Sequence, residues 1–297
     1  MDLRRVIGAQ PGRLLRLPDK GQLMICTDLH GNLRDFQAMA RLFEAQVEQG
    51  ADPFLLFTGD LVHGPSCTKE EWPEYLGSYF VDESAAVVEG FMRLQERYGR
   101  VACLIGNHEH SHVGGPHTPK FWPDETLHFE QTVGPKQTKR YRKLFRSFPA
   151  VAIARCGVVV THAAPNAEIT SSQQIEELRY EGLEDLPIAT LDEMPILGHL
   201  LWSRRCTPQV ARRFLDVLCV NGLSVDMVVF GHEIVAQGYD FIGQEQLMLS
   251  TSFGVPDANK TYLTLDLAGR YRGTEDLRPG VELLRLYPDV PDAPQPG

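Results

Sequence analysis

The chain has 297 residues, of which 43% are hydrophobic and 23% charged, a composition typical of a globular protein with a sizeable core. The formal net charge of −10 argues against general nucleic-acid binding, because an acidic surface repels the phosphates of DNA and RNA. No run of apolar residues reaches the roughly 18 residues of a membrane span, so we expect no membrane partner.

The six cysteines are scattered and contain no CxxC pair. Several lie in apolar, strand-like runs, where a cysteine usually acts as a small buried hydrophobe. The first twenty residues carry arginines but no apolar segment of the kind found in secretory signals. We therefore expect a reduced, cytoplasmic protein.

Short apolar runs alternate with helical patterns through most of the chain. Continuous apolar runs of this length predict strands that are buried on both faces. Apolar residues at helical spacing predict helices over 33–47 and 87–98, each followed by a glycine. The alternation predicts a layered α/β fold. The predicted strands lie in the segments 21–28, 53–60, 100–107, 157–165 and 226–233.

The pattern of the sequence changes after residue 232. Short strand-like runs are separated there by Gly, Pro and Asn, which predicts antiparallel hairpins. These runs lie in the segments 238–243, 246–253, 260–267 and 281–287.

The stretch 110–136, rich in Gly, Pro and His, is predicted to be a long irregular insertion. Its histidines are expected on a polar surface loop; they are His110, His112, His117 and His128. We expect one domain over residues 1–285 and a disordered tail over 286–297.

Polar residues follow each of the five predicted strands before residue 233. Ligand sites in α/β sheets form at the carboxyl ends of strands, so these residues should meet at one edge. Carboxylate, amide and imidazole donors without a thiolate suit Mn, Fe or Zn. Asp60 is the natural bridge between two such ions, which at about 3.5–4 Å apart would clamp a phosphate and activate water. The candidate donors are Asp28, His30, Asp60, Asn107, His162 and His232.

The motifs DLHGN, GDLV, GNHE, THAAP and FGHE, in this order, resemble those of the calcineurin-like metallophosphoesterases. The chain is more similar to the phosphoprotein phosphatase branch, which includes serine/threonine phosphatases and bacterial diadenosine tetraphosphatases. LLWS at 200–203 and the run at 231–254 match segments typical of that branch. The resemblance extends over about residues 22–267.

This resemblance implies two central mixed β-sheets flanked by helices, an αββα sandwich. It implies two divalent or trivalent metal ions, with Asp28 and His30 on the first and Asp60 bridging both. Asn107, His162 and His232 would bind the second ion. His108 would protonate the leaving oxygen, while a hydroxide held between the ions attacks phosphorus.

The second motif departs from the family pattern. Where the family has valine, aspartate, arginine and glycine, this chain has Val62 followed by His63, Gly64 and Pro65. The family's aspartate orients the acid histidine and its arginine binds the phosphate, so His63 is a candidate for one of these tasks. Ile105 stands where the phosphatases usually have another arginine. The candidate phosphate-binding residues are His63, Arg179, Arg204 and Arg205.

These observations predict a metal-dependent phosphomonoesterase similar to the serine/threonine protein phosphatases, acting on a phosphorylated protein. One alternative is a nucleotide phosphoesterase, either a dinucleoside polyphosphatase or a phosphodiesterase. A second alternative is a metal-binding scaffold with weak or no catalysis. The missing arginine favours the scaffold slightly, whereas retention of every metal donor and of His108 argues against it.

Overall fold

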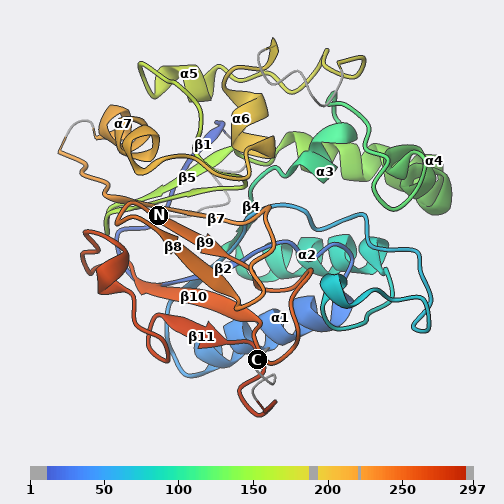
Figure 1. Cartoon of the computed structure of the whole chain (residues 1–297), viewed down its shortest axis with the longest axis horizontal. Coiled ribbons are helices and arrows are strands. Elements are labelled where there is room, and N and C mark those ends of the chain that lie inside the picture. Colours follow the sequence, from blue (N-terminus) through green and yellow to red (C-terminus); the bar gives the residue numbers. More distant parts are fainter. Residues whose placement is uncertain (1–11, 187–192, 220–221, 292–297) are drawn as a thin grey trace.

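The computed structural model describes residues 12–186, 193–219 and 222–291. Two β-sheets pack face to face, and helices cover the outer face of each (Figure 1). This is the αββα sandwich that the sequence predicts. The five apolar runs before residue 233 and the four after it each contain a strand.

The five-stranded sheet has the order β11-β10-β2-β3-β4. Strands β2, β3 and β4 run parallel, whereas β10 pairs antiparallel with both β2 and β11. Because the three parallel strands end at the same edge, the loops after them lie together. The bounds are β2 Gln22–Cys26, β3 Pro53–Phe57, β4 Val101–Cys103, β10 Thr261–Asp266 and β11 Leu283–Arg285.

The six-stranded sheet has the order β1-β5-β6-β7-β9-β8. Here β6, β7 and β9 are parallel, and β8 forms the expected antiparallel hairpin with β9. Strand β5 pairs parallel with β1 and antiparallel with β6, so both sheets are mixed. The bounds are β1 Leu14–Arg16, β5 Val151–Ala154, β6 Val158–Thr161, β7 Met227–Phe230, β8 Tyr239–Ile242 and β9 Gln246–Leu249.

The inner strands are buried on both faces, as their continuous apolar runs predict. In β2, Leu23 and Ile25 belong to the core between the two sheets. The alternate residues Met24 and Cys26 belong to the core beneath the helices. All four side chains are fully buried, because successive residues of a strand point to opposite faces.

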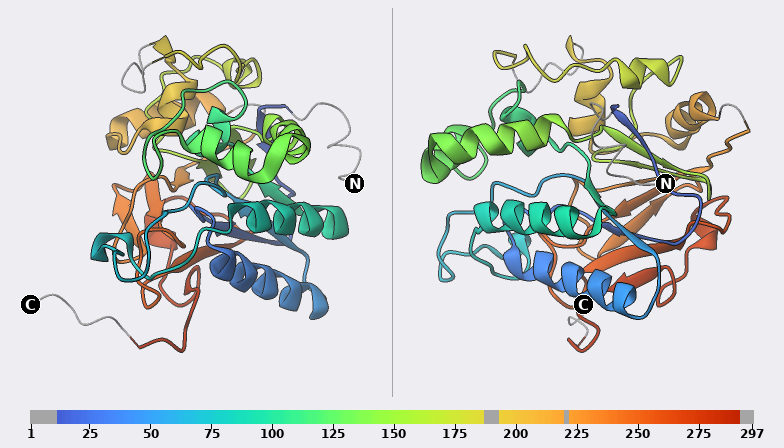
Figure 2. Two further views of the ribbon diagram at one scale, coloured as in Figure 1. Left: turned by 90° about the vertical axis from the view of Figure 1, so that its right-hand side faces the viewer. Right: turned by 180° about the vertical axis from the view of Figure 1, so that it is seen from behind.

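Helices α1 and α2 lie against the five-stranded sheet, and the remaining α-helices lie on the side of the six-stranded sheet (Figure 2). The first pair is α1 Leu33–Glu48 and α2 Ser84–Tyr98. The others are α3 Asn107–Ser111, α4 Glu125–Arg146, α5 Gln173–Glu176, α6 Leu197–Trp202 and α7 Pro208–Leu218. Among the described residues, 3₁₀ turns cover Glu74–Leu76 and Thr274–Asp276.

About half of the predicted irregular insertion at 110–136 is helical, which corrects that part of the prediction. Only the segment between α3 and α4, residues 112–124, is irregular. Helix α4 bends where Gly134 adopts a left-handed φ of 77° just before Pro135. Glycine and proline therefore mark a kink inside a helix here and not a loop.

Two histidines of this stretch are buried, contrary to the expected surface loop. His110 and His112 are 0% and 4% exposed, whereas His117 is exposed and His128 stacks on Trp122 at the surface. Nε2 of His110 contacts the Tyr180 carbonyl at 3.0 Å, which offsets part of the cost of burying this ring. Sequence periodicity cannot reveal such distant partners.

The folded part extends past residue 285. Leu286 is buried, and the Tyr287 hydroxyl donates a 2.6 Å hydrogen bond to the Asp35 carboxylate in α1. This contact corrects the predicted start of the tail. Residues 292–297 of that tail lie outside the described residues. Within the described ranges, no helix is both long and apolar enough to cross a membrane.

Asp35 is the centre of a buried polar cluster that ties α1 to the C-terminal strands. Its carboxylate accepts hydrogen bonds from Lys260 at 2.6 Å and from the Ser252 hydroxyl at 2.7 Å. Lys260 is 1% exposed and also lies 3.0 Å from Asp257. Removing one partner of such a cluster leaves an uncompensated charge in the interior.

We predict that Lys260→Met lowers the free energy of unfolding by about 3–5 kcal/mol, measured by urea denaturation. Arg97→Met is the matched control, because Arg97 pairs with Glu44 at the surface and such pairs contribute about 1 kcal/mol or less. Equal losses in the two variants would contradict the role of the buried cluster.

Candidate metal centre

The carboxyl ends of five strands bring the predicted donors to one edge of the sandwich. Asp28 and His30 follow β2, Asp60 follows β3, and Asn107 begins α3 just after β4. His162 and His232 follow β6 and β7 of the other sheet. The site therefore forms where the parallel parts of the two sheets meet, as the strand-end rule predicts.

The backbone is strained at these positions. Five non-glycine residues have positive φ within the described ranges, with values between 44° and 67°. Each such conformation costs about 1–3 kcal/mol and persists where the surroundings impose it, typically at functional sites. Four of the five are predicted metal donors, and the fifth is the candidate phosphate residue of the second motif. They are Asp28, His30, Asp60, His63 and His232.

The Asp60 carboxylate lies at the centre of the site. Its Oδ2 atom is 3.5 Å from Nε2 of His30 and 3.5 Å from Nε2 of His162. These separations are too long for strong hydrogen bonds. They are close to the separation of two ligands of one ion, since bonds of about 2.1 Å place neighbouring ligands about 3.0–3.4 Å apart. Burial alone would raise the pKa of Asp60, but the surrounding histidines hold it well below its usual value.

Both histidines are oriented through their other ring nitrogen. Nδ1 of His30 lies 3.0 Å from the carbonyl of His63, and Nδ1 of His162 lies 2.9 Å from the carbonyl of Thr58. An Nδ1–H donor in each contact leaves the Nε2 lone pair facing Asp60. Burial lowers the pKa of both imidazoles below 6.5, which favours the neutral form that binds metal.

Ligand atoms form two groups that share Asp60. One group combines Asp60 with His30 and His108, the other with His162 and His232, and the atoms of each lie within 4.8 Å. Asn107 joins the second group, because its Oδ1 is 2.9 Å from Nε2 of His162. The nitrogen and oxygen donors fit two ions, one on each side of Asp60.

Asp28 belongs to neither of these two groups. Its two carboxylate oxygens accept hydrogen bonds from the backbone of His232, at 3.0 and 3.1 Å. Burial raises the pKa of Asp28, and the charge of Asp60 raises it further. A cation between the two carboxylates would remove this repulsion.

Two glycines allow the carboxylates to sit against the backbone. A Cβ at Gly106 would lie 2.2 Å from Oδ1 of Asp60, and one at Gly231 would lie 2.1 Å from Oδ2 of Asp28. Neither position therefore has room for a side chain.

Glu109 is a supporting residue that the sequence analysis did not identify. Its carboxylate accepts hydrogen bonds from the backbone N–H of Asp60 at 2.8 Å, of Leu61 at 2.7 Å and of Gly106 at 3.1 Å. Burial, with the nearby charge of Asp60, raises the pKa of Glu109 to about 7. Glu109 thus fixes the two loops that carry Asp60 and Asn107.

His108 is placed between the metal donors and a second row of polar side chains. Its Nε2 faces Oδ2 of Asp60 at 4.0 Å. Its Nδ1 lies 2.9 Å from Nδ1 of His63 and 3.4 Å from a carboxylate oxygen of Glu125. The backbone N–H of His108 donates to Asp60 at 3.2 Å. The ring can therefore present Nε2 to a substrate while Nδ1 is held from behind.

His63 does not contact the cavity, contrary to the phosphate role considered for it. Its two ring nitrogens lie 2.9 Å from His108 and 2.9 Å from Nε2 of His112. Burial lowers the pKa of His63 well below 6.5, which favours the neutral form of the ring. This placement favours a role in orienting His108. His112 in turn contacts Glu130 at 2.9 Å.

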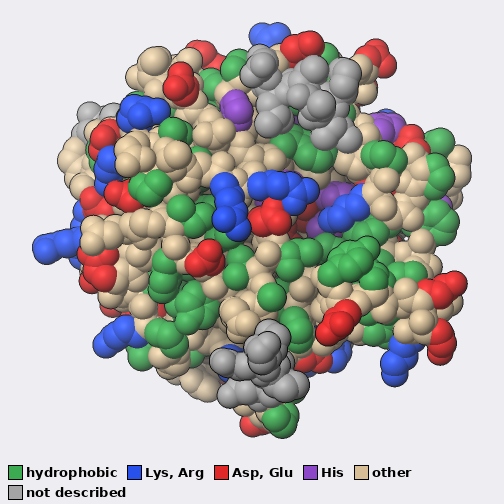
Figure 3. All heavy atoms as spheres, viewed as in Figure 1, with side chains coloured by type: hydrophobic (Ala, Val, Ile, Leu, Met, Phe, Trp, Pro, Cys, Tyr) green, Lys and Arg blue, Asp and Glu red, His purple; other side chains and the backbone are tan. Residues whose placement is uncertain are grey.

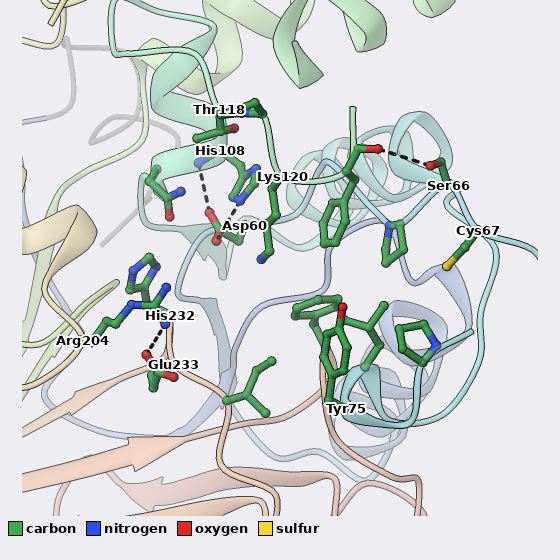
Figure 4. Close-up of a pocket in the computed structure, with 18 of the residues that line it drawn as sticks. Asp60, Ser66, Cys67, Tyr75, His108, Thr118, Lys120, Arg204, His232 and Glu233 are labelled. Carbon is green, nitrogen blue, oxygen red and sulfur yellow. Dashed lines mark hydrogen bonds and ion pairs between the residues drawn. The ribbon is translucent and has the colours of Figure 1, made fainter. Parts of the chain in front are cut away.

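A cavity of about 870 Å³ opens beside the donors. Figure 4 shows its two sides, with Asp60, His108, His232 and Arg204 on one and Tyr75 on the other. Apolar side chains also line the cavity, namely Leu76, Phe121, Ile234 and Phe253. The side chain of Lys120 points into the space between (Figure 4).

The predicted arginines differ in their access to this cavity. Arg204 lines it, and its guanidinium donates a 2.6 Å hydrogen bond to Glu233. Arg179 and Arg205 are exposed and are not among the lining residues. Lys120, which the sequence analysis missed, lines the cavity instead. Figure 3 shows Lys and Arg side chains gathered beside histidines near the middle of this face.

The fold and the donor set define a metallophosphoesterase. The model of the calcineurin-like phosphoesterase family matches residues 21–236, which include every predicted donor and His108. The chain belongs to the calcineurin-like phosphoesterase family.

One similar protein is Serine/threonine-protein phosphatase C23G10.1 from Caenorhabditis elegans. It is 26% identical over 243 residues, which cover 80% of this chain and 48% of the relative. The chain thus spans about half the length of that curated relative. The relative's name agrees with the branch that the motifs resemble.

Solved structures share the fold at low identity. A serine/threonine phosphatase from Saccharomyces cerevisiae aligns with a TM-score of 0.53 at 16% identity, over 84% of this chain and 76% of that one. A cold-active protein-tyrosine phosphatase from a psychrophilic Shewanella aligns with a TM-score of 0.54 at 16% identity, over 88% of this chain and 81% of that one. These likenesses support the fold alone.

We expect the stability of the protein to depend on pH through Glu130. Its carboxylate contacts His112, the last of the histidines behind His108. Burial would raise its pKa, but hydrogen bonds from His112 and Arg142 lower it from 4.5 to about 2. A lowered pKa stabilises the folded state above pH 4.5, and this contribution disappears as the pH falls towards 2.

We therefore expect Glu130→Gln to lower the free energy of unfolding at pH 7 by about 1–3 kcal/mol, allowing for solvent screening at Arg142. The difference from the wild type should shrink between pH 4.5 and pH 2. Urea denaturation at pH 7, 4 and 3 measures it, and a pH-independent difference would contradict the assignment.

Proposed function

We propose that the protein is a metal-dependent phosphomonoesterase. The single observation that carries this proposal is the Asp60 carboxylate, shared by two groups of nitrogen and oxygen donors on a strained backbone beside an open cavity. A structural role alone does not require so many costly backbone conformations at one place.

We assign the donors as the family resemblance implies. Asp28 and His30 would hold one ion, Asn107, His162 and His232 would hold the other, and Asp60 would be shared by the two. The donor set suits Mn, Fe or Zn. Two bound ions would lower the pKa of water and neutralise charge on the phosphoryl oxygens.

The residues of this chain perform the remaining tasks. His108 donates a proton from Nε2 to the leaving oxygen, and its contacts with His63 and Glu125 at Nδ1 hold the ring for this step. Glu109 keeps the loop of Asp60 fixed. Arg204 is the predicted arginine with access to the phosphate, whereas Arg179 and Arg205 have no contact with the cavity.

We propose phosphoserine or phosphothreonine in a protein as the substrate. Two observations support this choice. The Caenorhabditis elegans relative is named as a serine/threonine-protein phosphatase. The LLWS segment lies at the end of α6 and contributes Trp202 to the cavity wall. A nucleotide is the alternative, because the aromatic side of the cavity would also accept a base. The unpaired thiols of all six cysteines support a cytoplasmic location.

We expect the metal-loaded protein to hydrolyse p-nitrophenyl phosphate faster than bis(p-nitrophenyl) phosphate. Asp60→Asn should lose at least one of two metal equivalents and nearly all turnover. His108→Gln should keep both metals and lower kcat by about 10²- to 10⁴-fold. Turnover is measured after chelation and reloading with Mn, Zn or Fe, and metal content by elemental analysis.

Glu96→Gln serves as the control, because Glu96 is exposed on α2. Preference for the diester would replace the proposal with a phosphodiesterase. Two bound metals without turnover of any phosphopeptide or nucleotide would replace it with a metal-binding scaffold.

A further inference from the structure

Residues 118–125, here called the cavity loop, comprise the end of the irregular segment after α3 and the first residue of α4. Nothing in the five sequence motifs involves this loop. It nevertheless places two charged residues at the site: Lys120 in the cavity and Glu125 behind His108. Figure 4 shows Thr118 and Lys120 beside His108 and Asp60.

Glu125 determines the shape of the cavity loop. Its side chain accepts a 2.8 Å hydrogen bond from the backbone N–H of Phe121 and another from the Thr118 hydroxyl. Its own backbone N–H donates to the Thr118 carbonyl at 3.2 Å. Glu125 is 1% exposed, so these bonds form in the interior, where an unsatisfied carboxylate would be costly.

The same carboxylate faces the proposed acid. Its Oε2 atom lies 3.4 Å from Nδ1 of His108 and 3.8 Å from Nδ1 of His63. A carboxylate at one ring nitrogen favours the tautomer with a proton there and fixes the plane of the ring. Glu125 therefore directs Nε2 of His108 to the cavity.

Lys120 presents an unpaired cation to the cavity. Its Nζ atom lies 4.8 Å and 4.5 Å from the ring centroids of Phe121 and Phe253, which hold the side chain in place. No carboxylate of the described residues is within ion-pair distance of it. An ammonium held over aromatic rings beside metal donors attracts an anion that enters the cavity.

We propose that the cavity loop supplies the cation and the carboxylate that the second motif lacks. Lys120 binds the phosphoryl group, and Glu125 is the positioning residue for His108. This inference rests on the proposed phosphomonoesterase function. The segment after Asp60 has neither an aspartate nor an arginine, since His63, Gly64 and Pro65 stand there.

Inorganic phosphate tests Lys120 without requiring turnover. We expect Lys120→Met to weaken phosphate binding to the metal-loaded protein at least about tenfold by calorimetry, and to raise KM for p-nitrophenyl phosphate. Lys120→Arg should restore most of the affinity. Lys136→Met, at an exposed lysine of α4, is the matched control. An unchanged affinity in Lys120→Met would overturn this half of the proposal.

Leaving groups of different basicity test Glu125. Glu125→Gln keeps an acceptor for the cavity loop, so phosphate affinity should stay within about twofold. We expect its kcat to fall at least about tenfold more with phenyl phosphate than with p-nitrophenyl phosphate, because the poorer leaving group needs the acid more. Glu125→Asp should restore part of the rate, and Glu96→Gln should match the wild type.

An equal loss with both substrates would mean that Glu125 has a structural role only and would overturn this assignment. If the wild-type protein hydrolyses neither substrate, the proposed function fails instead. The ¹⁵N shifts of the His108 ring in the zinc-loaded protein then decide the positioning role, because they report its tautomer. An identical tautomer in Glu125→Gln would overturn the positioning role, whereas a changed one would support it.

Discussion

The position of one carboxylate determines most of this site. Asp60 lies between imidazoles from both sheets, and its backbone is left-handed where the loop leaves β3. This conformation holds only because Glu109 binds the backbone of Asp60 and Gly106 leaves space for the carboxylate. The fold thus offsets local strain with buried hydrogen bonds. Each of these supporting groups follows a strand end, so the sandwich itself brings them together.

Behind the donors, a row of polar side chains extends from the cavity to α4. His108, His63 and His112 are in contact through their ring nitrogens, and Glu130 with Arg142 ends the row near the surface. Neutral rings suit His63 and His112 in this interior, because burial lowers the pKa of both. The row links the first half of α4, before its kink, to the orientation of His108. The proposed acid is therefore held by a helix that none of the short motifs contains.

The sequence predicted the parts of the site that follow local rules. Apolar runs located β2 to β4 and β6 to β11 but not β1 or β5, and the strand-end rule then placed Asp28, Asp60 and His162 at one edge. It missed Lys120 and Glu125, because their roles depend on the path of an irregular segment that no periodicity describes. It also placed His112 at the surface, since a polar residue is predicted to be exposed as long as its distant partners are unknown. For the same reason, the sequence did not decide which of the candidate arginines lines the cavity.

The two-sided cavity has a consequence for inhibitors. A small anion would occupy only the polar side and leave the rings of Tyr75 and Phe121 in contact with water. Every additional 60 Å² or so of apolar surface that a ligand buries there is worth about 1.5 kcal/mol, or roughly a tenfold gain in affinity. Arylphosphonates, which join a non-hydrolysable anion to a flat hydrophobic group, match both sides at once and would provide selective probes of this protein.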